Sequence, residues 1–486
     1  MIYKLRPYQE ECVKSISYYI NSDRHDPVLI VGPVGCGKSL LIAEAARLMG
    51  DKTLILQPSK ELLQQNHDKI TSYGIPATIY SASCGKKELS NMIYATLGSI
   101  KKVVDKLKEM GIRNVLIDEA HAGYSPEDGS EFMTFMNELK PKKVIGFTAT
   151  PCRLKNMSIG QTSYSQLNFI TRMRPVYFKN LIHVIQVEEM IRQGFWTPLK
   201  YETWDFNGDA LKLNSNGSEY TAESISEAVR KNGLNNLILR RLMVLKDVCR
   251  SILVFMDSVE SCNTAAEWMN AKICAGMAEM VHGGTPKKQR EAIVERFKSG
   301  GTRVVFNYSA LGTGFDHPGL DCVIVGRPTF SFSSFYQWLG RAVRIKDGKD
   351  SALVVDCCNN SSRFGDIRKL SIENYKGYGW GMFIGDKLIT NIPMGDKVTK
   401  TDLDIKAAKK DRRRGLAQGV TAAPVPGRPD HPLGSTVMTF GKYCGWMFHS
   451  IPVSYFKFIN ETFDWDNDRD KDIKEYIDFL IKNNRL

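Results

Sequence analysis

Long apolar runs are missing from this sequence of 486 residues. No stretch approaches the roughly 18–20 apolar residues that a membrane-spanning helix needs. The first residues, MIYKLRPYQEECVKS, contain no apolar core of a signal peptide. We therefore expect an intracellular, cytoplasmic protein.

Cysteine pairs with metal-type spacing are also missing. The 11 cysteines are scattered, and none forms a C-x-x-C pair, so a structural zinc site is not expected. Scattered cysteines of this kind are typical of a reduced compartment, where the thiol serves as a small apolar side chain. We also find no internal repeat of short period.

Acidic residues are fewer than basic ones, 53 against 66, and the net charge is +13 with a pI of about 9.1. An excess of this size attracts polyanions such as nucleic acid or an acidic membrane surface, although it is also compatible with a role in solubility alone. The length and the 43% hydrophobic content indicate a globular protein of more than one domain.

Short apolar strands alternate with amphipathic helices in two regions of the chain. The expected strands are 28–32, 53–57, 114–120 and 143–150, then 251–258, 302–309, 322–328 and 352–358. The expected helices include 39–50, 59–70 and 287–300. This alternation predicts an α/β fold with two tandem parallel-sheet lobes, each with helices on both faces. The pattern breaks between about 155 and 245, where 207–220 is expected to be a surface loop or hairpin.

The composition divides the chain into four predicted segments. The first lobe is placed at 1–180 and the second at 181–385. A basic segment and a Pro/Gly-rich linker follow at 386–435, and a small accessory module, α+β or helical, is placed at 436–486.

A glycine loop, GPVGCGKS at 32–39, lies between an expected strand and an expected helix. That context is the one in which backbone N–H groups cradle nucleotide phosphates at a helix N-terminus. The predicted phosphate-binding residues are Gly32, Gly35, Gly37, Lys38 and Ser39. Lys38 would reach the β- and γ-phosphates, and Ser39 would hold Mg²⁺.

An acidic pair, Asp118 and Glu119, follows another expected strand. Carboxylates at the carboxyl end of a neighbouring parallel strand face the same crevice as the glycine loop. Asp118 is therefore predicted to hold Mg²⁺, and Glu119 to orient and deprotonate the attacking water.

The order of the motifs resembles that of superfamily 2 helicases, with RecA-like lobes. The motifs are GPVGCGKS (32–39), DEAH (118–121), TAT (148–150), NYSALGTGFDHP (307–318) and QWLGRAVR (337–344). The resemblance implies ATP and Mg²⁺ as cofactors, Gly314 and Asp316 at the nucleotide, and Gln337, Arg341 and Arg344 as catalytic residues. The two arginines lie three residues apart and share a helix face, so we interpret them as arginine fingers.

The segment LRPYQ (5–9) resembles the adenine-reading element of that superfamily. A glutamine amide both donates and accepts at an adenine edge. Gln9 is therefore the predicted nucleobase residue, with Arg6 and Tyr8 in support, which favours ATP over GTP.

In that superfamily the closing lobes grip one nucleic-acid strand by its phosphates. The matching segments here are 57–66, 95–100, 255–261 and 282–291. The predicted nucleic-acid contacts are Ser59, Lys60, Gly98, Ser99, Ser258 and Thr285. Such contacts fix position without reading sequence.

More narrowly, the chain resembles the RadD-like group of bacterial and phage helicases, and more loosely UvsW. The carriers are LRPYQEE, KELLQQNHDK, MIRQGFWTPL, TGFDHP and RPTFSFSSFYQWLGRAVR. The resemblance implies an ATP-dependent DNA helicase or translocase acting on forks or branches in recombination, replication or repair. One departure is the missing cysteine-rich zinc modules of the longer members. An RNA helicase, the motor subunit of a nuclease or restriction complex, and an ATP-switched binding protein are the alternatives.

The C-terminal stretch 438–459 resembles a short module with a GKYKG-like core, found at the ends of some nucleases and phage proteins. Lys442, Tyr443, Trp446 and Phe448 would suit stacking on exposed bases, or would form the core of a small domain. The basic run Lys409, Lys410, Arg412, Arg413 and Arg414 would add electrostatic affinity for DNA, or is a solvated face.

Overall fold

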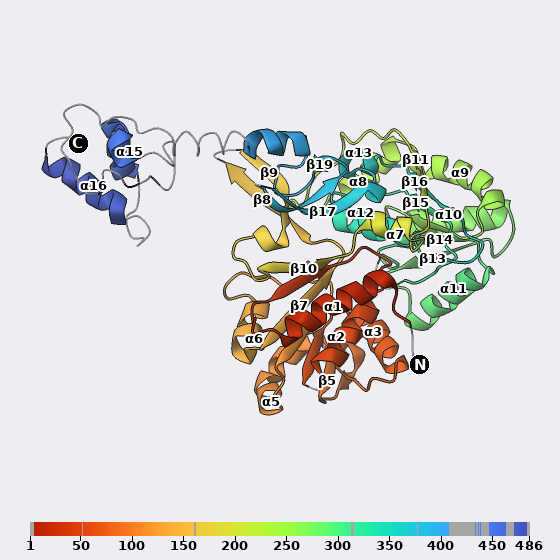
Figure 1. Ribbon diagram of the computed structural model, residues 1–486. Helices are drawn as coiled ribbons and strands as arrows, with labels where there is room; N and C mark the ends of the chain where they lie inside the picture. Colours follow the sequence, from red (N-terminus) through yellow and green to blue (C-terminus); the bar gives the residue numbers. More distant parts are fainter. Residues whose placement is uncertain are drawn as a thin grey trace. The chain divides into compact units, whose positions relative to one another are not determined.

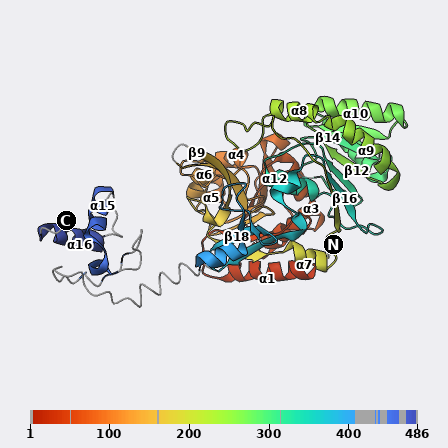
Figure 2. The same ribbon diagram turned by 90° about the horizontal axis from the view of Figure 1, so that it is seen from above.

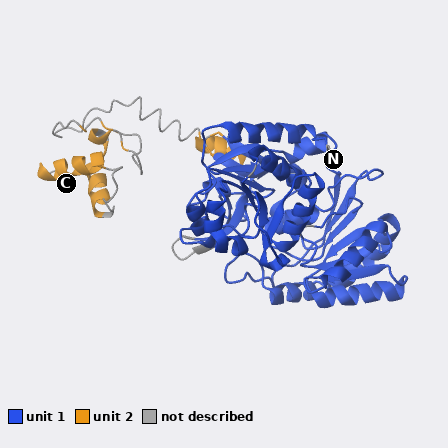
Figure 3. Cartoon of the chain, turned by 90° about the horizontal axis from the view of Figure 1, so that it is seen from below, with its two compact units in different colours: residues 1–375, 379–398 blue, residues 376–378, 399–486 orange. Residues whose placement is uncertain are grey.

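Two compact units divide the chain in this computed structural model (Figure 3). Unit 1 comprises Met1–Tyr375 and Gly379–Val398, and unit 2 comprises Lys376–Tyr378 and Thr399–Leu486. The structure describes residues 4–50, 52–159, 162–312, 315–376, 378–407, 447–462 and 471–483, together with Leu433, Thr436 and Met438.

The first lobe of unit 1 is built on one twisted sheet. Its strand order is β10 (Asn180–Val184), β1 (Val28–Val31), β7 (Lys143–Thr148), β6 (Asn114–Ile117), β2 (Thr53–Leu56), β5 (Met92–Ala95), β3 (Thr78–Ser81) and β4 (Lys86–Lys87). All neighbours are parallel except β3 and β4. The helices are α1 (Pro7–Asn21), α2 (Lys38–Met49), α3 (Lys60–Ser72), α4 (Leu97–Ile100), α5 (Val104–Glu109) and α6 (Glu131–Leu139).

The second lobe repeats the architecture. Its sheet has the order β11 (Leu199–Thr203), β16 (Ala352–Asp356), β15 (Cys322–Val325), β12 (Ile252–Phe255), β14 (Val304–Tyr308) and β13 (Ala278–His282), all parallel. Its helices are α8 (Ala222–Lys231), α9 (Leu234–Val248), α10 (Val259–Lys272), α11 (Lys287–Ser299), α12 (Phe332–Leu339) and α13 (Asn360–Phe364). The predicted fold class, two tandem RecA-like lobes, is confirmed, and each strand predicted from the sequence is present.

One hydrophobic core runs from the first lobe into the second. In β12, Leu253 and Phe255 pack into this shared core, whereas Ile252 and Val254 point to the other face and pack against the helices of the second lobe. Successive strand residues point to opposite faces, so the same strand serves both cores. The two lobes are therefore held against each other by apolar packing.

Shorter elements lie outside the two main sheets. They are the hairpin β8 (Cys152–Ile159) and β9 (Thr162–Phe169), helix α7 (Val187–Arg192), and the antiparallel strands β17 (Leu370–Tyr375), β18 (Gly379–Ile384) and β19 (Lys387–Leu388). Strand β20 (Val398–Thr399) lies where the chain passes between units. Because β10 returns to pair with β1, the first sheet extends to Val184, past the predicted boundary at 180.

Unit 2 contains α15 (Val453–Thr462) and α16 (Lys471–Lys482) packed around a small core. Phe448 is 1% exposed, and its ring lies 5.9 Å from Phe456 and 5.2 Å from Tyr476. Phe448 is thus a core residue and not a stacking surface. Lys442, Tyr443, Trp446 and the basic run 409–414 lie outside the described residues. Among the described helices, none is long and apolar enough to cross a membrane.

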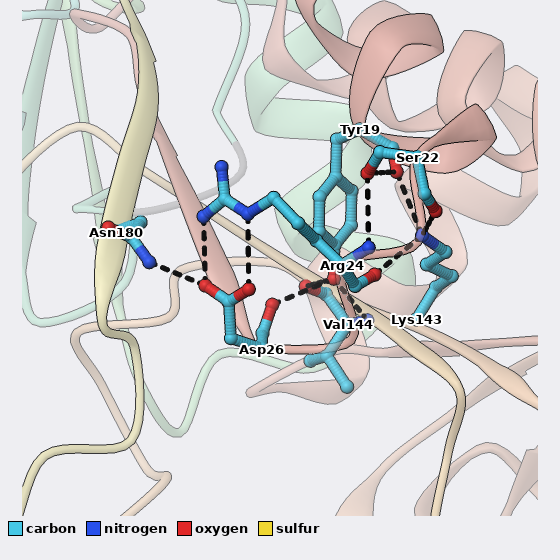
Figure 4. Close-up of polar contacts among 7 residues, drawn as sticks. All are labelled: Tyr19, Ser22, Arg24, Asp26, Lys143, Val144 and Asn180. Atoms are coloured by element: carbon cyan, nitrogen blue, oxygen red, sulfur yellow. Dashed lines mark hydrogen bonds and ion pairs between the residues drawn. The ribbon is translucent and has the colours of Figure 1, made fainter.

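The C-terminal end of α1 is anchored by a buried lysine (Figure 4). The Lys143 ammonium donates to the carbonyls of Tyr19, Ser22 and Arg24 at 2.9, 2.7 and 2.6 Å. It also lies 4.7 Å from the centre of the Tyr19 ring. A cation is favoured at this end of the helix dipole, where carbonyls lack intrahelical partners. Lys143 therefore fixes α1, whose other end carries Arg6 and Gln9.

Lys143→Met is expected to lower the free energy of unfolding by about 2–4 kcal/mol, because buried carbonyls lose their donor. Chemical denaturation measures this loss. Lys142→Met, an exposed neighbour, is the matched control and should stay within about 0.5 kcal/mol of the wild type. Equal stability of the two variants would contradict the anchoring role.

Candidate nucleotide site

A cavity of about 360 Å³ lies between the two lobes. From the first lobe it is lined by Arg6, Gln9, Gly35, Gly37, Lys38, Ser39, Asp118 and Glu119, and from the second by Asp316, Gln337, Arg341 and Arg344. All of these residues were predicted from the sequence for nucleotide binding or catalysis. Of the other three such residues, Gly32 follows β1 and Tyr8 is buried, and neither lines the cavity, whereas Gly314 lies outside the described residues.

The glycine loop has the backbone shape that a phosphate cradle requires. Gly35 and Gly37 both have φ of +83°, a left-handed conformation that disfavours other residues. A side chain at Gly37 would also place its Cβ 2.6 Å from Nε2 of Gln9. At Gly32 the Cβ would lie 2.7 Å from Sγ of Cys36, so this glycine permits close packing beneath the loop. The chain then enters α2 at Lys38, so the loop lies at the positive end of a helix dipole.

The predicted adenine-reading residues hold the glycine loop. Nε2 of Gln9 donates to the carbonyl of Cys36 at 2.9 Å, and its Oε1 accepts from the backbone N–H of Arg6 at 2.9 Å. The hydroxyl of Tyr8 donates to the same Cys36 carbonyl at 3.2 Å. Gln9 is therefore at the cavity wall, as predicted, but each end of its amide has a protein partner.

Opposite charges converge behind the loop. Nζ of Lys38 lies 3.3 Å from Oε1 of Glu119. Burial alone would lower the pKa of Lys38, but the charges of Glu119 and Asp118 outweigh burial and raise it. Burial alone would raise the pKa of Glu119, but Lys38 and His121 outweigh it and keep the pKa low. For Asp118, burial and the neighbouring Glu119 raise the pKa above its usual range. At neutral pH, Lys38 is therefore charged and Glu119 is a carboxylate.

His121 connects the acidic pair to the second lobe. Its Nδ1 lies 3.4 Å from Oε2 of Glu119 and 2.8 Å from Oγ1 of Thr148. Its Nε2 lies 3.1 Å from Oγ of Ser333 in α12. The same Ser333 hydroxyl lies 3.2 Å from Oγ1 of Thr150. The carboxylate, the TAT segment and the second lobe thus share one polar network.

Sequence reasoning missed Asn66, which links the two predicted Mg²⁺ ligands. Its Oδ1 accepts from the hydroxyl of Ser39 at 2.6 Å, and its Nδ2 donates to Oδ2 of Asp118 at 2.9 Å and to Oε1 of Gln57 at 3.1 Å. Asn66 is 4% exposed. Its signal in the sequence was an amide on the otherwise apolar, sheet-facing side of α3, with Leu63 and Ile70.

Asn66→Leu is expected to weaken Mg²⁺-dependent nucleotide binding about 10-fold, because residues that orient metal ligands typically contribute 10- to 100-fold in affinity. A Mg²⁺ titration followed with a fluorescent ATP analogue measures the change. Gln64→Leu, whose amide bonds Asp68 on the exposed side of α3, is the control. Identical Mg²⁺ titrations for the two variants would contradict the assignment.

The two arginines have different environments. The guanidinium of Arg341 donates to the carbonyls of Phe315 and Gly312 at 2.7 and 2.6 Å, and burial lowers its pKa to about 10. Arg344 pairs with Asp316 and is partly exposed. The Nε groups of both arginines are buried without an acceptor. Arg341 therefore holds the main chain at Gly312 and Phe315, and Arg344 is the freer cation.

The predicted nucleic-acid contacts lie away from this cavity, just after strand ends. Ser59 caps α3 after β2, and Ser258 caps α10 after β12, each accepting a backbone N–H. Oγ of Ser99 accepts from the N–H of Ala82 at 2.9 Å, and Oγ1 of Thr285 accepts from the N–H of His282 at 3.0 Å. The exposed Lys60 begins α3, and Gly98 is also exposed. The hydroxyls thus serve local structure, which leaves their contact with nucleic acid a prediction.

The residues present fit a magnesium nucleotide. The buried Nε groups of Arg341 and Arg344 lack acceptors at the cavity wall, and a phosphate would supply them. Ser39 and Asp118 offer oxygen donors held together by one amide, as a hard cation prefers. The volume is within the range of small-molecule sites.

Comparison with known proteins gives matches for both lobes. Residues 2–153 match the family model described as "Type III restriction enzyme, res subunit", and residues 235–346 match "Helicase conserved C-terminal domain". A 51.5 kDa protein of a Lactococcus phage is 25% identical over 68% of this chain and 65% of its own length. The ATP-dependent DNA helicase Hel308 of Pyrococcus horikoshii is 25% identical over 69% of this chain and 49% of its own length.

Among solved structures, the DNA-bound ATP-dependent Type ISP restriction-modification enzyme LlaBIII superposes with a TM-score of 0.54 at 15% identity. The match covers 74% of this chain and 28% of the enzyme. This likeness shows the fold. The chain spans less than two thirds of the length of the relatives named here.

Proposed function

We propose that this chain, a superfamily 2 helicase by its two motor domains, is an ATP-dependent DNA helicase or translocase. The observation that supports the proposal best is the cavity between the lobes. Phosphate-binding and acidic residues of the first lobe face arginines of the second across a single space. Such a site is complete only when the lobes are together, so nucleotide turnover would change the distance between them.

In this mechanism the N–H groups of the glycine loop and Lys38 bind the phosphates. Mg²⁺, held by Ser39 and Asp118, would neutralise phosphate charge. Glu119 accepts the proton of the attacking water, since its low pKa keeps it deprotonated. Arg344 offers its guanidinium to the charge that develops on the transferred phosphoryl group. His121 contacts both Glu119 and Ser333, so protonation of Glu119 would change the hydrogen bonding of the second lobe through His121.

The nucleic acid would lie across the strand-end loops that carry Ser59, Ser99, Ser258 and Thr285. A second cavity, of about 300 Å³, is lined in part by Phe255 and Met256, which come just before Ser258 in the sequence. It is lined by Arg327 and Trp338, and the ring of Trp338 stacks on Phe255 with centroids 5.0 Å apart. A cation beside an aromatic pair suits a nucleotide of a single strand. The net charge of +13 supports a polyanionic substrate.

The finer assignment is a DEAH-type, RadD-like or UvsW-like motor acting on forked or branched DNA in recombination, replication or repair, in a bacterial or phage-infected cytoplasm. Its support is the motif resemblance, and the match to a phage protein agrees with it.

The steady-state ATPase rate on a panel of nucleic acids tests the proposal. The panel is no nucleic acid, single-stranded DNA, blunt duplex, a fork, a four-way junction and matched RNA, with Lys38→Ala as the inactive control. We expect the largest stimulation with fork or junction DNA. Stimulation by RNA alone would instead identify an RNA helicase, and a rate indifferent to all of them would overturn the motor function.

A second candidate is the motor subunit of a restriction or nuclease complex. The first-lobe match to the Type III restriction model and the fold shared with LlaBIII favour it. Incubating the chain with supercoiled DNA, ATP and Mg²⁺ tests this candidate. Nicking that disappears in Asp118→Ala would support it, and intact DNA would leave the first proposal.

A further inference from the structure

Three consecutive residues between the lobes each contact a different wall of the nucleotide cavity. Phe195 contacts the adenine-reading element, because the Arg6 guanidinium lies 4.6 Å from the centre of its ring and the Tyr8 ring lies 5.3 Å away. Nε1 of Trp196 donates to the carbonyl of Val34 in the glycine loop at 2.7 Å. Thr197 contacts the segment that carries the second-lobe arginines.

The bonds of Thr197 are to the main chain beside Arg344. Its Oγ1 donates to the carbonyl of Arg344 at 2.7 Å, and its N–H donates to the carbonyl of Val343 at 2.8 Å. The Arg344 carbonyl also accepts from Nζ of Lys349 at 2.8 Å. Trp196 and Thr197 are each 2% exposed. These bonds are therefore shielded from water.

Both ends of this short segment are fixed. Gly194, with φ of +73°, follows the end of α7, and the N–H of Phe195 donates to the carbonyl of Met190 at 2.8 Å. After Thr197, the carbonyl of Pro198 accepts from the N–H of Ala352, and β11 begins in the second sheet. The connection between the lobes is thus a short strap pinned on both sides. In Figures 1 and 2, α7 lies beside α1.

We propose that Trp196 and Thr197 are positioning residues for ATP hydrolysis, which together set the spacing between the glycine loop and Arg344. The indole holds the loop from one side of the strap, and the threonine holds the arginine segment from the other. A shift in one contact moves the other, because only one peptide bond separates the two residues. The inference rests on the proposed ATPase activity. It assigns to this strap the coupling between the first-lobe and second-lobe sides of the nucleotide site.

The distance between the nucleotide phosphates and Arg344 should affect the rate of ATP hydrolysis more than the affinity for the nucleotide. Binding requires the loop, Lys38 and the base contacts, whereas the transition state also requires Arg344 at its correct distance. Misplacement of a catalytic group by about 1 Å can cost on the order of 100-fold in rate. Loosening either contact should therefore lower kcat with little change in nucleotide affinity.

The test measures kcat, KM, nucleotide affinity and melting temperature in Trp196→Phe, Thr197→Val and the double variant. Trp196→Phe removes the indole N–H and keeps an aromatic ring, and Thr197→Val keeps the shape without the hydroxyl. Loss of one buried hydrogen bond corresponds to about 5- to 10-fold in rate. We expect about that reduction in kcat for each variant, with nucleotide Kd within about threefold. The kcat of the double variant should fall by less than the product of the two single reductions, because both substitutions change the same distance between the glycine loop and Arg344.

Two variants keep the test independent of folding. Trp204→Phe removes a comparable indole bond, to Glu202 at 2.9 Å, in the second lobe and away from the cavity. It should leave kcat unchanged. Thr197→Ser keeps the hydroxyl and should restore the rate lost in Thr197→Val.

If the wild type is active and Trp196→Phe has the same kcat, the inference is wrong and the proposed function stands. The same holds if Thr197→Ser is as slow as Thr197→Val. Reductions that multiply in the double variant would also overturn the inference. An inactive wild type on every nucleic acid would overturn the proposed function and this inference together.

Discussion

Glu119→Gln is expected to lower kcat for ATP hydrolysis by about 10²–10⁴-fold while ATP remains bound. The amide keeps the shape of the side chain but accepts no proton from water, and loss of a general base typically costs this much. The low pKa of Glu119, next to Lys38, means that the wild-type carboxylate is ready as a base at neutral pH. Steady-state turnover and binding of a fluorescent ATP analogue together separate the two effects.

Glu127→Gln is the matched control for that experiment. Glu127 is an exposed acid in the following loop, 3.7 Å from Lys155, and outside the cavity. Its variant should turn over ATP at the wild-type rate. A Glu119→Gln enzyme within about fivefold of the wild type would mean that another group activates the water.

Arg344→Ala is expected to reduce kcat about 10³-fold with an unchanged melting temperature. The estimate follows from the effect of arginine fingers in phosphoryl transfer. Arg344 pairs only with the half-exposed Asp316 through its side chain among the described residues, so its loss breaks little structure. Single-turnover ATPase kinetics and thermal unfolding measure the two quantities. Arg344→Lys should not restore the rate, because an ammonium lacks the planar fork of a guanidinium.

Arg341→Ala should behave differently from Arg344→Ala. Arg341 donates to two carbonyls of the neighbouring segment, so its removal leaves buried acceptors unpaired. We expect a lower melting temperature together with a lower rate. Arg296→Ala, which removes an ion pair on the exposed side of α11, is the neutral control for both. Equal kcat for Arg344→Ala and this control would refute the finger assignment.

Motif spacing was enough to predict most of the candidate site. Phosphate transfer requires the residue types of the glycine loop, the acidic pair and the arginines at such intervals. The structure places Lys38, Asp118, Glu119, Arg341 and Arg344 around one cavity. Apolar runs that end in polar residues likewise predicted the central strands, because parallel strands buried on both faces read as continuous hydrophobic segments.

Side-chain partners could not be predicted in the same way. From the sequence, the side chain of Gln9 is free to contact a base. In the structure its amide is bonded to the main chain of Arg6 and of Cys36, and Cys36 lies 27 residues further along the chain. Asn66 and Trp196 lie in segments that carry the family resemblance, but the sequence predicted no role for either side chain. Their bonds reach Ser39, Asp118 and Val34 across large sequence separations. Phe448 was ambiguous until its burial showed it to be a core residue.

By itself, then, the sequence determined the two-lobed α/β architecture and predicted which residues would bind phosphate, because periodicity and motif spacing are local properties of the chain. The tertiary structure alone decided which arginine is bonded to neighbouring carbonyls, which amide joins the two predicted Mg²⁺ ligands, and how one short strap contacts both sides of the cavity. Those features depend on contacts between segments far apart in sequence, and packing the two sheets on a shared core is what creates them.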